Sequence, residues 1–489
     1  MNLAEKTIFS LLMAFGLAAC GSSDTPSNAP ATPERNGAAP NILVLVADDA
    51  GVEQFASFNI GTAPAPTPNL DALAARGMQF STVWAQPLCS PTRATLLTGR
   101  YAFRTGVGWA TLGAGVDAEY PEAPEPFADA LPEILEDLST VRGISKEVRP
   151  VDAPPASYGL RRDEIALPQL LRETADYATA AIGKWHLGDS RNGWLEHPGN
   201  AGFEHYSVNM RNQPESFFSW WENVNGALEH RTGYTPQRKV DDAIAWLQDR
   251  DDRPWFLWMA FNLPHYPQHL PEVNGIETPG DAAADQRATL DAMIARLDQE
   301  IGRLLAAIDE DVLENTIVVF VGDNGTTGES VDPPFHPDRA KFTLYEGGVR
   351  VPLIFAGPSI PAGASSGVLV NTTDVFATIA ELAGASLPAD RMLDSVSLAP
   401  YFANPARDSI RTYQFAESFH SEYGAITGSY AVGDGEFKLI SKRAGLELYD
   451  LGADLSESRN LLADGISASE QAAVEKLEEI AETLRRSAE

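Results

Sequence analysis

Two apolar runs, far apart in the chain, end in the same kind of polar pair. Residues 41–47 (Asn-Ile-Leu-Val-Leu-Val-Ala) end at Asp48-Asp49, and residues 316–322 (Thr-Ile-Val-Val-Phe-Val-Gly) end at Asp323-Asn324. Unbroken apolar runs with little helical periodicity suit strands that are buried on both faces, as in a parallel sheet. Ligand sites of open α/β sheets lie at the carboxyl edge of such strands, so we expect the two pairs to meet there.

Three carboxylates and one amide at one sheet edge would repel one another unless a cation lay between them. For either pair alone, an aspartate that forms a turn after a strand is the simpler interpretation. Together, Asp48, Asp49, Asp323 and Asn324 favour a metal site. Ligands that are all oxygen atoms favour a hard ion, Ca²⁺ or Mg²⁺.

Two more strand-like runs end in titratable groups. Residues 177–183 lead into Lys184 and His186, and residues 254–262 lead into His265. Lys184 and His186 are two positions apart and share a face if the strand continues. A single histidine is more often structural than catalytic, but both histidines here follow strands that end at the edge where the acidic pairs lie. They are therefore candidate site residues.

The remaining pattern predicts an α/β fold. Helix-like stretches lie between the strands: residues 67–77, with Gly77 as the stop, 286–308 with a 3.6-residue apolar period, and 374–382. This alternation predicts a doubly wound domain over residues 41–408, with a mixed, mostly parallel sheet flanked by helices. From residue 409 the pattern changes to short strand-like runs and a closing helix, which predicts a smaller subdomain over residues 409–489. The expected short strands are 412–415, 430–433, 437–440 and 447–451, and the expected helix is 467–487.

The N-terminus has the pattern of an export signal. Lys6 precedes an apolar stretch of 12 residues, Ile8 to Ala19, which is too short to span a bilayer. The sequence Leu17-Ala-Ala-Cys20 resembles a bacterial lipobox, which implies a signal peptide over residues 1–19 and lipidation of Cys20. An ordinary secretory signal that has a cysteine near its cleavage site is the alternative.

The expected location follows from that signal. Residues 20–40 are rich in Pro, Ala and Ser and predict a disordered tether. We expect an extracytoplasmic bacterial lipoprotein, on the outer membrane or a periplasmic face, held to the membrane by its lipid anchor only.

The formal net charge of −32 excludes non-specific binding to nucleic acid. It also repels an anionic substrate. Any such substrate must be attracted at short range by a metal ion and by local Lys or Arg side chains.

Cys89 is the only cysteine besides Cys20. In Cys89-Ser-Pro-Thr-Arg93, Pro91 fits the first turn of a helix, whose free N–H groups and dipole favour an anion. Arg93 would lie one turn later on the same face, where it can pair with a charged oxygen. The pattern favours a nucleophile at a helix start, and a buried structural cysteine is the alternative.

Four segments together resemble the type I, formylglycine-dependent sulfatases of the alkaline phosphatase superfamily. They are residues 87–100, 183–188 (Gly-Lys-Trp-His-Leu-Gly), 264–267 (Pro-His-Tyr-Pro) and 341–352. The resemblance extends over roughly residues 40–463, and it implies that the C-terminal subdomain is an antiparallel sheet with a helix packed on it. It also implies a maturation enzyme that oxidises Cys89 to Cα-formylglycine, whose hydrated aldehyde attacks sulfur.

The resemblance assigns roles to the candidate residues. Asp48, Asp49, Asp323 and Asn324, with the modified Cys89, would hold Ca²⁺ in preference to Mg²⁺. Arg93, Lys184 and Lys341 would balance the charge of the sulfate. His265 and Lys341 are candidates for protonating the leaving oxygen, and His186 would remove a proton from the remaining hydroxyl. The division of roles between the two histidines stays open.

Two features bear on the substrate. Phe342 stands where the family usually has Gly, and we expect it to alter the local backbone or to shape a pocket wall. Residues 110–165 are rich in proline and acidic residues, which suits either a substrate-selecting insertion or a solvated acidic loop.

The expected activity is hydrolysis of a sulfate ester, on a small molecule or a glycan taken from outside the cell. A phosphonate monoester or phosphodiester hydrolase of the same superfamily is one alternative. A lipoprotein that binds sulfated glycans without cleaving them is a second, and a metal-dependent phosphatase is a third. The sequence does not indicate which hydroxyl position is attacked, whether action is endo or exo, or the oligomeric state.

Overall fold

The computed structural model describes residues 39–111, 159–189, 192–212, 214, 216–271, 286–419, 428–463 and 465–487. Residues from Ala39 onward form one compact unit. The predicted signal peptide, the lipidation site Cys20 and nearly all of the predicted tether lie outside the described residues, as does most of the acidic segment 110–165.

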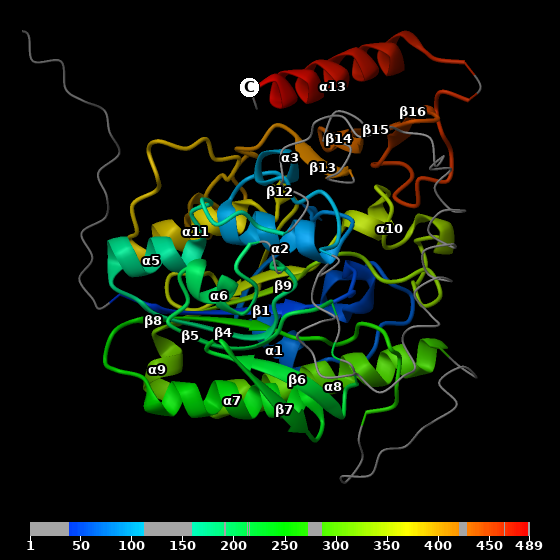
Figure 1. Ribbon diagram of the computed structural model, residues 1–489. Helices are drawn as coiled ribbons and strands as arrows, with labels where there is room; N and C mark the ends of the chain where they lie inside the picture. The colour runs from blue at the N-terminus through cyan, green and yellow to red at the C-terminus, as the bar shows by residue number, and fades with distance from the viewer. Residues whose placement is uncertain are drawn as a thin grey trace, which may run out of the picture. The chain divides into compact units, whose positions relative to one another are not determined.

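A ten-stranded sheet forms the centre of this unit (Figure 1). Its middle strands are β9 (Thr316–Gly322), β1 (Asn41–Ala47), β8 (Trp255–Ala260) and β4 (Ala178–Lys184), in that order and all parallel. Outside β4 lie β5 (His205–Asn209), β6 (Ser219–Val224) and β7 (Ala227–Thr232), and outside β9 lie β10 (Leu353–Ala356), β2 (Gly77–Phe80) and β11 (Ala364–Ser366). The sheet is mixed and mostly parallel, as predicted.

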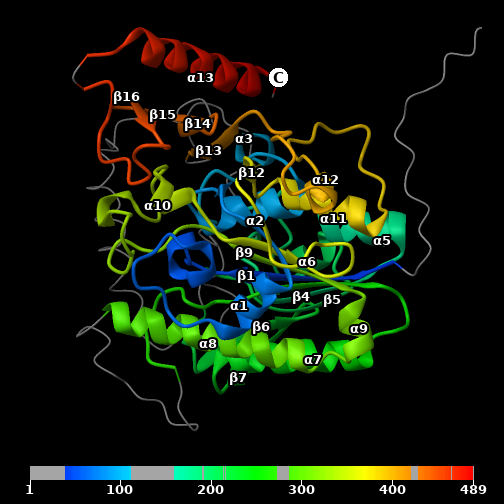
Figure 2. The ribbon, with the colours of Figure 1, turned by 180° about the vertical axis from the view of Figure 1, so that it is seen from behind.

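Both faces of the sheet are covered by helices. Successive residues of β1 alternate between two apolar cores, with Val44 and Val46 in one and Leu43 and Leu45 in the other. The first core packs under α2 (Cys89–Thr98), α5 (Leu167–Ala175) and α11 (Asp374–Ala383). The second packs against α1 (Pro68–Ala75), α7 (Thr235–Asp249) and α8 (Gln286–Ala306). Figures 1 and 2 show the two helical layers from opposite sides, which confirms the doubly wound fold.

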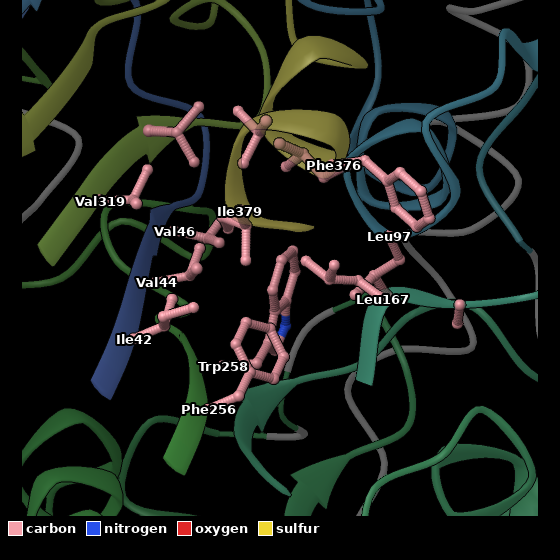
Figure 3. Packing of buried hydrophobic residues seen from close by; sticks show 14 of the residues in the cluster. Ile42, Val44, Val46, Leu97, Leu167, Phe256, Trp258, Val319, Phe376 and Ile379 are labelled. Carbon is pink, nitrogen blue, oxygen red and sulfur yellow. The ribbon is translucent and has the colours of Figure 1, made fainter. Parts of the chain in front are cut away.

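Large side chains fill the first core (Figure 3). Trp258 and Phe256 of β8 lie beside the β1 valines, and Leu97 of α2 and Phe376 of α11 close the cluster from above. The core therefore fixes α2, and with it Cys89, against the strand that carries Asp48.

The long elements predicted from the sequence are present, with shifts of a few residues at their ends. Gly77, which was expected to end the helix, follows α1 and is itself the first residue of β2. The antiparallel strands β2 and β10 and the β6–β7 hairpin were not predicted. The other short elements are β3 (Val83–Trp84), β12 (Val370–Asn371), α3 (Ala102–Thr105), α6 (His197–Asn200), α9 (Glu310–Glu314), α10 (Glu346–Val349) and α12 (Ala399–Ala403).

The C-terminal part is a four-stranded antiparallel sheet with a helix packed on it, as expected. Its strands are β13 (Gln414–Ser418), β14 (Ser429–Gly433), β15 (Phe437–Lys442) and β16 (Gly445–Asp450). The helix α13 (Ala468–Arg486) begins with a capping box between Ser467 and Glu470, and its Val474 and Leu477 pack in the apolar core of this sheet.

A buried ion network joins this small sheet to the larger α/β part. Lys438 Nζ on β15 lies 2.9 Å from both Glu346 Oε1 on α10 and Glu457 Oε1, and 4.6 Å from the centre of the Trp84 ring. Arg350 pairs with the second oxygen of Glu346 at 2.7 Å. Burial raises the pKa of Glu457 to about 7, although Lys438 opposes that rise. The network fixes α10, five residues after Lys341.

Within the described ranges, no helix combines the length and the apolar character that a bilayer crossing requires.

Lys438→Met should lower the free energy of unfolding by about 3–5 kcal/mol, because it leaves two buried carboxylates without their shared cation. The control is Lys442→Met on the same strand, which removes a partly exposed pair with Glu447 and a contact with the Tyr345 hydroxyl and should cost about 1 kcal/mol or less. Denaturant unfolding measures both. Equal losses would show that the buried network contributes no more than a surface pair.

Acid should destabilise the protein through His197. Its ring accepts a hydrogen bond from Trp185 Nε1 and donates one to the Leu160 carbonyl, and burial lowers its pKa to about 4. In the unfolded chain the His197 ring becomes protonated below about pH 6.5, and in the folded chain only near pH 4. Stability is therefore lost as the pH falls through that window. His197→Gln should show a shallower decline between pH 6.5 and 4 in unfolding experiments at fixed salt. Parallel curves for the two proteins would contradict this assignment.

Candidate active site

The carboxyl edge of the sheet brings the two polar pairs together. β1 and β9 are adjacent and in register, with Ala47 opposite Gly322, so Asp48 and Asp323 follow at the same level. The backbone N–H of Asp49 donates to Asp323 Oδ1 at 3.1 Å, and Asn324 Nδ2 donates to Asp49 Oδ1 at 2.9 Å. All four residues are buried.

Each of the three carboxylates lies against a basic side chain. Lys184 Nζ lies 2.7 and 2.8 Å from the two oxygens of Asp48, and Lys341 Nζ lies 2.5 Å from Asp49 Oδ1. Arg93 donates twice to Asp323 Oδ2, at 2.8 and 3.0 Å. The expected mutual repulsion is therefore offset in part by the chain's own cations, which come from β4, α2 and the loop before α10.

The two neighbouring aspartates have opposite pKa shifts. Burial raises the pKa of Asp48 to about 8, with Lys184 opposing the rise and Asp323 adding to it. Burial also acts to raise the pKa of Asp49, but Lys341, His265 and Lys184 outweigh it and hold that pKa below its ordinary value. Asp49 is thus the carboxylate that stays ionised most readily.

Cys89 is the first residue of α2 and lies beside these charges. Its Sγ is 4.0 Å from Asp49 Oδ1 and 3.8 Å from Asn212 Oδ1, and it is buried. The next residue anchors the helix start, because Ser90 Oγ donates to the His186 carbonyl at 2.7 Å and accepts from Thr111 N–H. Burial alone fits a structural cysteine, whereas a place at a helix N-terminus among buried charges fits a nucleophile.

His186 reaches the site in a different way from the one expected. β4 ends at Lys184, and His186 adopts a φ of 56°, so the two residues are not on one face of a continued strand. Its Nε2 lies 3.0 Å from the Thr111 carbonyl and must be the protonated nitrogen, since a carbonyl only accepts. Nδ1 is buried and has no hydrogen-bond partner in the described part of the chain. Burial, with Lys184 and Arg93, holds the pKa of His186 well below its usual range, which leaves a neutral ring with a free lone pair.

His265 lies beside Asp49, in the loop after β8. Its Nδ1 lies 2.7 Å from the Tyr266 carbonyl, which makes Nδ1 the donor there. Its Nε2 lies 3.6 Å from Asp49 Oδ2. A proton on Nε2 would face the site.

The donor set suits a divalent metal ion. One ligand atom each from Asp48, Asp49, Cys89 and His265 lies within 4.8 Å of the others. Asn324 Oδ1 is buried and accepts no hydrogen bond from any described group, which fits an oxygen that coordinates a cation. The oxygens of Asp48, Asp49 and Asn324 are hard donors that fit Ca²⁺ or Mg²⁺, whereas the Cys89 thiol and the His265 ring are softer donors. Asp323 is not part of this cluster, and its two oxygens accept hydrogen bonds from Asp49 N–H and Arg93.

Two residues of the site were missed in the sequence. Asn212 lies three residues after β5, and its Oδ1 accepts from Lys184 Nζ at 2.9 Å and faces Cys89. Thr111 binds both Ser90 and His186 through its backbone. The position of Asn212 after the strand next to β4 was the only available signal, and a backbone contact such as that of Thr111 leaves no signal in a single sequence.

Comparison with known families gives a consistent result. The family model described as Sulfatase matches residues 40–385, and the model described as N-sulphoglucosamine sulphohydrolase, C-terminal, matches residues 338–486. Both parts of the described fold are therefore matched.

Individual relatives agree with the family models. N-acetylgalactosamine-6-sulfatase of Sus scrofa is 31% identical over 386 residues, which is 74% of this chain and 65% of that protein. A protein named sulfatase from Formosa agariphila is 28% identical over 95% of this chain and 91% of its own length. The solved structure of Ps i-CgsB in complex with k-i-k-neocarrahexaose is 25% identical, with a TM-score of 0.69, and covers 91% of this chain and 93% of that one.

Loss of a group that only orients a metal ligand typically weakens metal binding roughly 10–100-fold. Asp323→Asn should weaken divalent metal binding by more than that. The side chain keeps its size, but one buried negative charge is lost. Metal content by elemental analysis and a calcium titration by calorimetry would measure the effect. The control is Asp298→Asn, a buried carboxylate that accepts from Leu70 N–H away from this edge and should leave metal content unchanged. Full metal content in Asp323→Asn would remove Asp323 from the ligand set.

Proposed function

The chain belongs to the sulfatase family, and from that membership we propose that it hydrolyses a sulfate ester of an extracytoplasmic glycan, with a formylglycine made from Cys89 and a bound Ca²⁺. Hydrolysis of sulfate esters is the activity of the family. The observation that carries the finer proposal is the position of Cys89, at the N-terminus of α2 and 4.0 Å from Asp49 Oδ1.

Charge explains why a metal is needed. When all three buried carboxylates are ionised they balance the three buried bases, so the site has no net charge before a substrate arrives, and a metal ion would keep Asp48 ionised against its raised pKa. A sulfate monoester brings one further negative charge into a protein whose net charge is −32. Ca²⁺ held by Asp48, Asp49, Asp323 and Asn324 would give the site a net positive charge. Preorganised charges of this kind are worth about 3–4 kcal/mol per donor in the transition state.

Formylglycine supplies a hydrated aldehyde with a hydroxyl nucleophile where a thiol stands in the unmodified chain. The helix N-terminus favours negative charge at that position. Asp49 Oδ1 lies 4.0 Å from Cys89 Sγ, and the lowered pKa of Asp49 keeps this carboxylate ionised, so it is placed to accept the hydroxyl proton as a weak base. Arg93, fixed by Asp323 and the Lys184 carbonyl, holds one side of the site rigid.

The two histidines suit opposite tasks. His186 is neutral, with a bare Nδ1, and would act as the base that takes a proton from the remaining hydroxyl. His265 donates from Nδ1 to Tyr266, so its Nε2 would carry a proton for the leaving oxygen only when the ring is the imidazolium, with the Asp49 carboxylate 3.6 Å away as its counter-charge. Lys341, whose pKa is raised above its usual value by Asp49 against the effect of burial, stays charged and is better suited to holding the sulfate. General acid and base steps contribute about 10²–10⁴-fold each.

A glycan is the proposed substrate class for two reasons. The porcine relative is named for N-acetylgalactosamine 6-sulfate, and the solved relative contains a neocarrahexaose. The predicted lipid anchor at Cys20 would place the enzyme outside the cytoplasm, where sulfated polysaccharides are met. The maturation enzyme is the second partner that the proposal requires.

Cys89→Ala removes the proposed nucleophile and should lower kcat at least about 10³-fold. Thermal stability should change little, because only one small side chain is lost from a helix terminus. The assay would compare 4-nitrophenyl sulfate with bis(4-nitrophenyl) phosphate, which separates a sulfatase from a phosphodiesterase of the same superfamily. Retained turnover in Cys89→Ala would exclude the proposed nucleophile, and faster cleavage of the phosphodiester would favour the alternative activity.

The modification itself is tested by mass. The tryptic peptide that carries Cys89 should be about 18 Da lighter than the cysteine form and should react with an aldehyde reagent, as expected for a nucleophile made from the thiol. Protein from the native host is compared with protein from a host without a maturation enzyme. An unmodified thiol in an active enzyme would overturn the formylglycine proposal.

A further inference from the structure

Phe342, next to Lys341, has a backbone conformation that aromatic residues rarely adopt. Its φ is 74°, in the left-handed region, which costs a residue other than glycine about 1–2 kcal/mol. A bulky residue there is a genuine outlier, and such strain concentrates at functional sites. Glycine would hold the same turn without strain, so the phenyl ring itself needs an explanation.

The backbone around Phe342 is tied to both halves of the site. Its N–H donates to the Pro87 carbonyl at 3.1 Å, two residues before Cys89. The N–H of Lys341 donates to the Thr326 carbonyl at 2.9 Å, two residues after Asn324. Phe342 therefore cannot relax to an ordinary φ without moving Lys341, and the backbone that carries its ring is tied to the residues beside Cys89 and Asn324.

The ring lies beside the charges that would bind sulfate, yet part of it is open to water. Lys341 Nζ, 2.5 Å from Asp49 Oδ1, lies 5.0 Å from the centre of the Phe342 ring, within the range of a cation–π contact. Phe342 is 39% exposed, whereas the side chain of Lys341 is 4% exposed. The ring thus borders the site on its solvent side.

A second exposed aromatic residue occupies an equivalent position. Tyr266, 51% exposed, directly follows His265, whose Nε2 approaches Asp49 Oδ2. A single exposed apolar side chain is ordinary. Here Lys341 and His265, the two basic side chains beside the oxygens of Asp49, are each followed by an exposed aromatic side chain, so an ester that extends outward from Asp49 meets aromatic surface.

We propose that Phe342 is a specificity-determining residue, whose ring stacks on the C–H face of the pyranose that carries the cleavable sulfate, with Tyr266 as a second aromatic contact. This inference rests on the proposed sulfatase function. The face of an aromatic ring is electron-rich, and sugar C–H groups are weak donors to it. In a chain of net charge −32, surface charge does not attract a sulfated glycan, so an uncharged contact is the means left for recognising the sugar.

The test uses the full-length, matured enzyme and three substitutions, Phe342→Gly, Phe342→Leu and Phe342→Tyr. The substrate is the sulfated pyranoside with the highest kcat/KM in a panel of sulfated mono- and oligosaccharides. Inorganic sulfate, as a competitive inhibitor, is the probe that has no ring. The control Leu387→Ala removes an exposed apolar side chain in the segment after α11. It should change neither KM for the sulfated pyranoside nor the inhibition constant of sulfate.

Loss of stacking removes binding that is equal in the ground and transition states, so KM should rise with little change in kcat. We expect the Gly and Leu variants to raise KM about 3–10-fold, the Tyr variant to stay within about twofold, and inhibition by sulfate to be unchanged. An unchanged KM in the Gly and Leu variants would overturn the proposal. A parallel rise in the sulfate inhibition constant would also overturn it, because Phe342 would then act only by positioning Lys341.

Failure of the inference can be told from failure of the proposed function. Hydrolysis of 4-nitrophenyl sulfate without hydrolysis of any sulfated pyranoside would leave the sulfatase chemistry intact and reject the stacking. If no sulfate ester is hydrolysed, the proposed function fails, and binding of the same sugars to the Cys89→Ala protein by calorimetry still decides the stacking. An equal affinity in Cys89→Ala and Cys89→Ala/Phe342→Leu would reject it.

Discussion

The parallel register of β1 with β9 is the constraint on which the site depends. It sets Asp48 beside Asp323 at one edge of a sheet that is buried on both faces. Burying carboxylates so close together is costly unless cations compensate. The chain supplies those cations from three separate elements, α2, β4 and the loop before α10. Ion pairs thereby hold elements that are far apart in the sequence together at the site. Charge as well as apolar packing fixes their relative positions.

The parts of the fold that the sequence predicts are those governed by simple repeating rules. β1 and β9 are continuous apolar runs because both their faces are covered, and α8 shows a clear 3.6-residue period because one of its faces is buried. β2 and β10 have four residues each, too few for any period to be visible, and their antiparallel pairing is decided by distant partners.

The same distinction holds within the site. Polar groups that directly follow a buried strand could be predicted, since the strand fixes where they end. Asn212 could not, because a loop carries it to Lys184 after β5 has ended. The positive φ of His186 could not be predicted from the sequence, whereas the glycine that the family usually has at position 342 was a signal for the positive φ of Phe342. The acidic stretch 110–165 and the lipid-anchor signal remain predictions from sequence.

The burial of Cys89 limits when its thiol can be changed. The residue is 1% exposed, and the residues of α2 that follow it are buried as well. The proposed maturation enzyme would have to reach this side chain, and in the folded protein it is inaccessible. The proposed modification would therefore compete with folding of the newly made chain. A molecule that packs α2 before modification would become a stable protein without a nucleophile, so the active fraction in a cell would be set by the ratio of two rates rather than by an equilibrium.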